Sequence, residues 1–263
     1  MSTEIFSDAQ TRTLTDIGGR ALRITLALGA QRVELIQFID RPGQPYPVDS
    51  SASDLLFQHF ALVVSDMTAA MQSLSAQLGW TPISSEGPQR LPASSGGVSA
   101  FKFRDPEGHP LELLAFPEKD MPAHWKQVLQ DAHGDSPFLG IDHSAICVSD
   151  GTRSVSFYES LGLIVSNRSV NSDPAQAKLD DLDRPFVDVI AMSADQATPH
   201  LELLCYRNRD NNDSLDLQAN DVAATSLVFE ADDRSKQNET PNMWQRSLID
   251  PDGHRLVIAP SAA

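Results

Sequence analysis

The chain has 263 residues, a net charge of −16 and a hydrophobic fraction of 41%. A chain of this composition can bury a core, and its charge would repel a phosphate backbone, so we expect no nucleic-acid binding. No stretch approaches the roughly 20 apolar residues of a membrane span, and the N-terminus lacks the basic and apolar regions of a secretory signal. We therefore expect a cytoplasmic protein without membrane contact. Cys147 and Cys205 stand in apolar runs, which predicts reduced, buried thiols rather than a disulfide framework.

An apolar run with a similar pattern recurs four times along the chain. The four copies span residues 32–38, 110–116, 200–206 and 255–260. Each is short and bounded by turn-forming residues on at least one side, which predicts a largely buried strand. A glutamate stands at the same register in the first three copies, as Glu34, Glu112 and Glu202, whereas the fourth has Val257 there. The alternation of side chains along a strand also leaves open that these glutamates face solvent.

A second pattern is a strand that begins with a polar residue and runs into an aspartate. Its three copies span residues 59–66, 143–150 and 226–233, and they begin with His59, His143 and Ser226. Asp66 and Asp150 are followed by apolar residues at helical spacing, so we predict that each caps a helix.

A third pattern is a tight turn, Asp-Pro-x-Gly-His, at residues 105–109 and 250–254. Its Asp-Pro and Gly residues predict a connection between two antiparallel strands.

The order of these patterns predicts an α+β fold of repeated βαβββ modules. Four modules fit the chain: A (about 5–40), B (about 56–117), C (about 139–207) and D (about 219–260). Module A is incomplete, because only its final hairpin is evident and its first strand is missing, although Ser7-Asp8 resembles Ser172-Asp173 of module C. Module D is shortened, and we expect that a helix and a strand are missing from it.

The linkers indicate how the modules pair. Glu34 and His59 are separated by nearly the same length of chain as Glu202 and Ser226, which indicates a duplicated unit. We therefore predict two paired, cupped mixed sheets: residues 1–120 for the first pair (A+B), residues 121–138 for a linker with a short helix, and residues 139–263 for the second pair (C+D). Pairing of module B with module C is the alternative.

A strand-initial histidine, an aspartate-capped helix, the Asp-Pro-x-Gly-His turn and the Leu-Glu-Leu strand together resemble the vicinal oxygen chelate superfamily. That superfamily contains glyoxalases, extradiol dioxygenases and bleomycin-resistance proteins. The resemblance covers the chain from about Ala21 to Pro260. It implies that two modules close a cupped sheet around a divalent metal ion, with ligands from the first and last strands of each module.

Carried onto this sequence, the resemblance implies a metal site in the A+B pair at Glu34, His59 and Glu112. The C+D pair offers His143 and Glu202, but Ser226 and Val257 are poor candidates for the remaining positions. The alternative B+C pairing supplies a full set of four: His59, Glu112, His143 and Glu202.

The resemblance also implies a range of functions. We expect binding of a divalent ion (Fe, Zn, Ni, Mn or Mg) and of a small oxygen-chelating metabolite, with lyase, isomerase or oxygenase chemistry and Glu34 or Glu112 as the base. The protein is then a metal-dependent enzyme, and the alternative is a metal-free small-molecule-binding module of the bleomycin-resistance type. Because module A has an exposed sheet edge, we also expect a homodimer.

Overall fold

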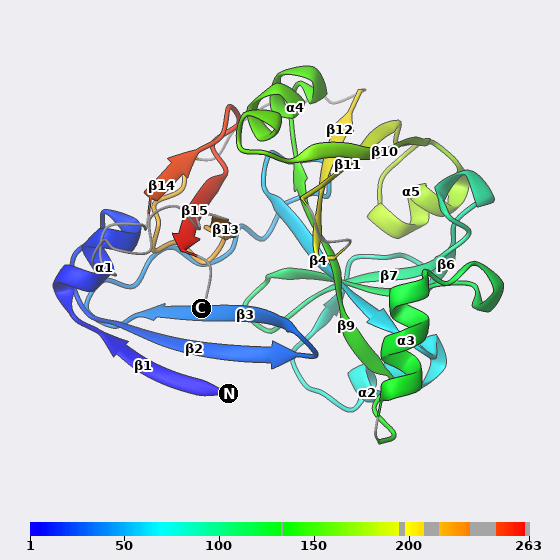
Figure 1. Ribbon diagram of the computed structural model, residues 1–263, viewed down its shortest axis with the longest axis horizontal. Helices are drawn as coiled ribbons and strands as arrows, with labels where there is room; N and C mark the ends of the chain where they lie inside the picture. Colours follow the sequence, from blue (N-terminus) through cyan, green and yellow to red (C-terminus); the bar gives the residue numbers. More distant parts are fainter. Residues whose placement is uncertain (133, 195–197, 208–215, 232–245, 261–263) are drawn as a thin grey trace.

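The computed structural model describes residues 1–132, 134–194, 198–207, 216–231 and 246–260. These residues form five α-helices and three β-sheets, which confirms the α+β class (Figure 1). The central sheet has nine strands, and two further sheets of three strands each both lie to its left in Figure 1. No helix among the described residues is long and apolar enough to cross a membrane.

Module A forms its own antiparallel sheet in the order β1-β2-β3. Its elements are β1 (Ser2–Phe6), α1 (Asp8–Thr15), β2 (Ala21–Leu28) and β3 (Gln31–Phe38). Ser7 caps α1 by accepting from the Gln10 backbone N–H. The expectation that module A holds only its final hairpin is therefore wrong, because a strand and a helix precede that hairpin.

Modules B and C together form the nine-stranded sheet, in the order β10-β11-β12-β9-β4-β8-β7-β5 with β6 on β7. The strands of module B are β4 (Phe57–Val64), β5 (Thr81–Pro82), β6 (Gln89–Arg90), β7 (Ser99–Arg104) and β8 (Pro110–Ala115), and those of module C are β9 (Phe138–Cys147), β10 (Ile164–Asn171), β11 (Val187–Ser193) and β12 (His200–Tyr206). The helices are α2 (Met67–Ser75), α3 (Ala123–Asp131), α4 (Gly151–Ser160) and α5 (Pro174–Asp180), with short 3₁₀ turns η1 (Ala93–Ser95) and η2 (Glu118–Asp120).

The local signals in modules B, C and D are confirmed. Asp66 accepts from the Ala69 N–H at the start of α2, and Asp150 accepts from the Thr152 and Arg153 N–H groups at the start of α4. In the turn at 105–109, the Asp105 carboxylate accepts from the backbone N–H groups of residues 107 and 109, and Asp250 does the same for residues 252 and 254. The turn chemistry read from the sequence therefore operates in both copies.

The pairing of modules differs from the one we expected. β4 of module B pairs antiparallel with β9 of module C, whereas β3 of module A pairs only with β2 among the described strands. The two linkers of similar length do occupy matching places, because Gln44 of the A-to-B linker bonds to Asp221 and Val222 of the C-to-D linker. The matching lengths therefore reflect the duplication of a two-module unit. They do not show which modules share a sheet, and the shared sheet joins module B of the first unit to module C of the second.

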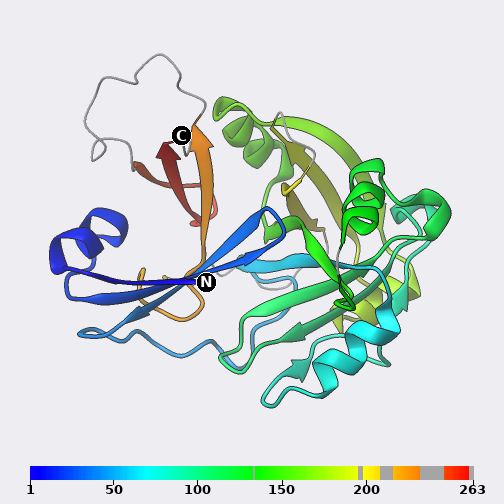
Figure 2. The same ribbon diagram turned by 60° about the horizontal axis from the view of Figure 1, so that its bottom comes forward.

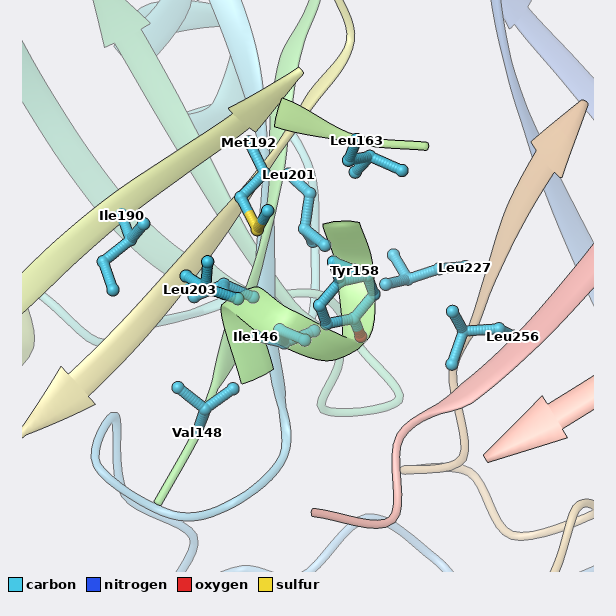
Figure 3. Packing of buried hydrophobic residues seen from close by; sticks show 11 residues of the cluster. Ile146, Val148, Tyr158, Leu163, Ile190, Met192, Leu201, Leu203, Leu227 and Leu256 are labelled. Atoms are coloured by element: carbon cyan, nitrogen blue, oxygen red, sulfur yellow. The ribbon is translucent and has the colours of Figure 1, made fainter. Parts of the chain in front are cut away.

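Module D packs on module C. Its sheet, in the order β13-β15-β14, contains β13 (Ser226–Ala231), β14 (Arg246–Ile249) and β15 (Arg255–Pro260). Leu227 and Leu256 belong to one apolar cluster with Tyr158 of α4 and Leu203 of β12, and Leu227 lies next to Tyr158 (Figure 3). The predicted loss of a helix and a strand from module D falls on residues 232–245, which lie outside the described residues.

Two helices pack on the face of the central sheet that also carries His59 and Glu112. Trp125 of α3 contacts Val63 and Leu139, and Leu179 of α5 contacts Ala61 and Leu114. In Figures 1 and 2 these helices come from different segments, α3 from the B-to-C linker and α5 from within module C. The two helices therefore cover separate parts of this face.

Candidate metal centre

Four strands at the middle of the central sheet bring four metal-ligand side chains to one face. β4 and β8 run parallel with Ala61 opposite Glu112, and β9 and β12 run parallel with Ala145 opposite Glu202. His59 and His143 precede these alanines by two residues, so each lies on the same face as its alanine. The antiparallel β4–β9 pair then joins the two halves with pseudo-twofold symmetry, with His59 opposite Ala145.

The donor atoms of these residues lie close together. His59 Nε2 is 3.2 Å from Glu112 Oε2 and 3.3 Å from His143 Nε2. His143 Nε2 is 3.5 Å from Glu112 Oε2 and 3.6 Å from Glu202 Oε2. The structure thus brings His59, Glu112 and His143 together and places Glu202 beside His143, which is the B+C combination that was the alternative.

The fifth residue, Glu34, lies elsewhere. It stands on β3, where its carboxylate accepts from Arg23 at 3.2 Å, and 39% of its side chain is exposed. Arg23 also pairs with Glu4 on β1. The expected roles of Glu34 as a ligand and as a base are therefore wrong, because the sheet of module A does not join the sheet that carries His59 and Glu112.

The cluster is buried and strongly charged. The side chains of His59, Glu112 and His143 are 3%, 6% and 7% exposed, and that of Glu202 is 22% exposed. Burial lowers the pKa of His59, with Glu112 opposing it. Burial alone would lower the pKa of His143, but the charge of Glu202 and hydrogen bonds to Asp142 and Glu112 hold it well above its usual value.

The two glutamates stay ionised for a related reason. Burial alone would raise the pKa of Glu112, but His59, His143 and Lys102 hold it well below its usual value. Burial opposes ionisation of Glu202 as well, and His143 and His200 lower its pKa. We call these four residues the metal cup: Glu112 lies beside both imidazoles, and Glu202 lies beside His143. A proton on His143 compensates only part of the negative charge of the two carboxylates.

The donor set fits a divalent ion. Nitrogen and oxygen ligands bind Zn²⁺ and similar ions at about 2.0–2.2 Å, which places neighbouring donors of one ion roughly 3–3.5 Å apart. The separations of 3.2 to 3.6 Å agree with that spacing. Mixed imidazole and carboxylate ligands suit borderline and hard divalent ions. His59, Glu112 and His143 also form a cluster in which one ligand atom from each lies within 4.8 Å of the others.

A second layer of side chains orients His143. Its Nδ1 lies 3.1 Å from Asp142 Oδ2, and Trp125 of α3 donates its indole N–H to Asp142 Oδ1 at 2.8 Å. This contact favours a proton on Nδ1 and leaves Nε2 directed toward the cup. His59 differs, because its buried Nδ1 has no hydrogen-bond partner among the described residues.

Two further groups beside the cup were not predicted from the sequence. His200 lies next to His143 across the β9–β12 pair, and its Nε2 is 3.6 Å from Glu202 Oε1. Lys102 lies opposite Glu112 across the β7–β8 pair and donates to Asp180 of α5 at 2.7 Å. A lysine in the apolar run Phe101-Lys102-Phe103 was the available signal, because a charge is rarely buried without a partner.

Comparisons with known proteins agree with this architecture. Residues 140–258 match the family model described as the Glyoxalase/Bleomycin resistance protein/Dioxygenase superfamily. A search of curated proteins finds no match. Two structures of mutants of glyoxalase I from Zea mays are similar in fold, each at 17% identity. One has a TM-score of 0.53, and the match covers 92% of this chain and 78% of that chain. The other has a TM-score of 0.52, and the match covers 92% of this chain and 79% of that chain. A structure of methylmalonyl-CoA epimerase from Mycobacterium tuberculosis has a TM-score of 0.38 at 16% identity, and the match covers 59% of this chain and 92% of that chain.

Proposed function

We propose that this chain, which belongs to the vicinal oxygen chelate superfamily, is a metal-dependent enzyme of the glyoxalase type that acts on a small metabolite with two chelating oxygens. The observation that carries the proposal is the convergence of His59, Glu112 and His143 at separations of 3.2 to 3.5 Å, with Glu202 3.6 Å from His143. Four such donors on four strands match the ligand positions that the superfamily resemblance implies for one complete module pair.

The size of the ligand set favours lyase or isomerase chemistry over oxygenase chemistry. Non-haem iron oxygenases use two histidines and one carboxylate and keep the remaining positions open. This cup offers a second carboxylate, Glu202, opposite Glu112. A divalent ion held by such a set supplies Lewis-acid polarisation of a substrate oxygen.

The environments of the two glutamates suggest different roles. Glu112 is enclosed by His59, His143 and Lys102, and its pKa is held well below its usual value, which suits a permanent ligand. Glu202 has the most exposed side chain of the four, and His200 lies 3.6 Å from its Oε1. We therefore assign Glu202 as the carboxylate that takes a proton from the substrate, with His200 placed to stabilise its charge.

Thermal unfolding with and without divalent ions tests the proposal. A ligand that binds only the folded chain at 100 times its Kd stabilises it by about 2.7 kcal/mol, which corresponds to roughly 5–10 °C for a chain of this size. We expect such a rise in Tm with at least one of Zn²⁺, Ni²⁺, Co²⁺ or Mn²⁺, and its loss in Glu112→Gln. Glu34→Gln is the matched control, and it should respond like the wild type. A wild-type Tm that no divalent ion changes would contradict the proposal.

A metal-free binding protein is the second candidate. It is favoured by the internal pairing of His143, whose ring contacts Glu112, Glu202 and Asp142 and thereby compensates much of the buried charge without an ion. In that case the same unfolding experiment gives no response to ions, and Glu112→Gln leaves the Tm response to small carbonyl compounds intact.

A further inference from the structure

The cup of the proposed enzyme is mostly covered in this structure. Three of the four donor side chains are less than 10% exposed, and only Glu202, at 22%, reaches solvent to a larger extent. We therefore expect a covering element to move when a substrate binds. One of the covering elements is α5, whose Leu179 packs on Ala61, Ala100 and Leu114. Ala175 packs against the same cluster. Polar contacts add to this attachment: Ser84 Oγ donates to the Leu179 carbonyl, and the Ser85 N–H donates to the Lys178 carbonyl.

The main polar anchor of α5 is the carboxylate of Asp180. It is fully buried, with a side-chain exposure of 0%. Two of its donors come from the sheet: Lys102 Nζ of β7 at 2.7 Å and the hydroxyl of Tyr206 of β12 at 2.8 Å. A third comes from α5 itself, the Gln176 amide at 2.7 Å. The sheet therefore presents a lysine and a phenol to one carboxylate, and that carboxylate belongs to the covering helix.

The place of Lys102 connects this anchor to the metal cup. Lys102 is the cross-strand neighbour of Glu112, so their Cβ atoms lie on the same face about 5 Å apart. Tyr206 lies on β12, on the same face as Glu202, four residues away. The two donors thus come from opposite sides of the cup, on strands that carry its ligands or adjoin them.

The chain on the C-terminal side of α5 has unusual backbone geometry. Asp181 and Arg184 have φ values of 52° and 46°, in the left-handed region that residues other than glycine seldom adopt. Asp181 is the C-cap of α5, and its backbone N–H donates to the Ala177 carbonyl, so the helix ends directly after the buried Asp180.

We propose that Lys102 and Tyr206 form a carboxylate subsite beside the metal cup, which Asp180 fills while α5 is closed and which an anionic group of the substrate takes when α5 opens. The inference rests on the proposed function. It names the substrate class more closely: a small molecule with two chelating oxygens and, a few bonds away, a carboxylate. The buried ammonium of Lys102 keeps an anionic partner in both states, as the cost of burying an unpaired charge requires.

The test uses two probes that differ only in the distal group, 2-oxoglutarate and its 5-amide, 2-oxoglutaramate. Calorimetric titration of the metal-loaded full chain should show at least a tenfold loss of affinity for 2-oxoglutarate in Lys102→Met, with less than a twofold change for the amide. Lys119→Met removes an exposed lysine on η2, whose side chain is 83% exposed, and serves as the matched control. Tyr206→Phe removes one hydroxyl only, and it should show the same selective loss, about threefold, if Lys102→Met fails to fold.

Hydrogen exchange on the wild type tests the displacement directly. Amides of residues 176–182 should exchange at least tenfold faster with bound 2-oxoglutarate than with bound amide. Equal losses for both probes in the variants, or unchanged protection of α5 while 2-oxoglutarate binds, would overturn the inference. The metal content is measured in the same samples: a full complement of metal without carboxylate preference refutes only the subsite, whereas absence of metal from the wild type refutes the proposed function and the subsite together.

Discussion

The Leu-Glu-Leu strands of the central sheet and of the module A sheet share a sequence pattern and differ in almost everything else. Leu113 and Leu203, which follow Glu112 and Glu202, are 1% and 0% exposed, whereas Leu35, which follows Glu34, is 46% exposed. The central strands have a parallel neighbour on one side and a covering helix on one face. β3 has only β2 beside it among the described strands.

This difference shows what a strand pattern does and does not encode. The alternation of residues places a glutamate on one face of a strand, but the neighbours of that strand decide whether the face is a cup or a surface. Glu112 meets two imidazoles and a lysine, and Glu34 meets Arg23 near solvent. The metal-binding potential is therefore a property of the module pair and not of the strand.

Substitution of the leucine after each glutamate should give the largest contrast in stability. Leu203→Ala removes a fully buried side chain from the cluster of Figure 3, and it should lower the free energy of unfolding by about 2–5 kcal/mol. Leu35→Ala removes a side chain that is nearly half exposed, and it should cost less than about 1 kcal/mol. Urea unfolding monitored by tryptophan fluorescence measures both values, and similar losses would contradict the contrast.

The two Asp-Pro-x-Gly-His turns should differ by a smaller amount. Asp252 is buried and accepts from the backbone N–H and hydroxyl of Ser149 and from Arg153, so it ties module D to module C. Asp252→Ala should cost about 1–3 kcal/mol, because Ser149, Arg153 and the buried Ser154 all lose the carboxylate that accepts from them. Glu107→Ala is the equivalent change in the exposed turn of module B and should stay within about 0.5 kcal/mol.

Equal costs for these two variants in the same urea experiment would show that Asp252 does not support the contact between the modules.

The smallest expected effect is a pH dependence confined to the module B turn. The hydrogen bond from His109 to Asp105 raises the pKa of His109 above its usual value of 6.5, although partial burial opposes the shift. The folded state then binds a proton more tightly than the unfolded state, so this contribution is present below pH 6.5 and is lost as the pH rises through the raised pKa.

Its size is at most about 1 kcal/mol, because both side chains are partly exposed. His109→Ala should therefore lower the free energy of unfolding more at pH 5.5 than at pH 8.5, as measured by urea unfolding at both values. A loss that is the same at both pH values would show that the pair is not an ion pair in the folded state.

Much of the fold could be predicted from the sequence because its signals are local. The helix caps at Asp66 and Asp150, the two tight turns and the buried strands depend on neighbours a few residues away. The resemblance between Ser7-Asp8 and Ser172-Asp173 has a structural counterpart as well, because Ser7 caps α1 and Asp173 caps α5, each between two strands of an antiparallel sheet.

The module pairing could not be predicted in the same way. A duplicated two-module unit has the same sequence whether its halves pair with each other or across the duplication, so the linker lengths could not decide between His143 and Glu34 as the third ligand. The side chains that surround the cup could not be predicted from the sequence either. Lys102, Asp142 and His200 act through contacts with residues of other elements, such as Asp180 and Trp125, which strand alternation does not identify.

The most direct test of the account is the metal content of the purified protein, measured by ICP-MS for the wild type, His59→Ala, His143→Ala and Glu34→Gln. We expect close to one divalent ion per chain in the wild type and in Glu34→Gln. Both histidine variants should lose most of the metal, because the two histidines come from different modules and contribute to one cup. Retention of the metal in His143→Ala, or its loss in Glu34→Gln, would contradict the pairing of modules B and C around the ion.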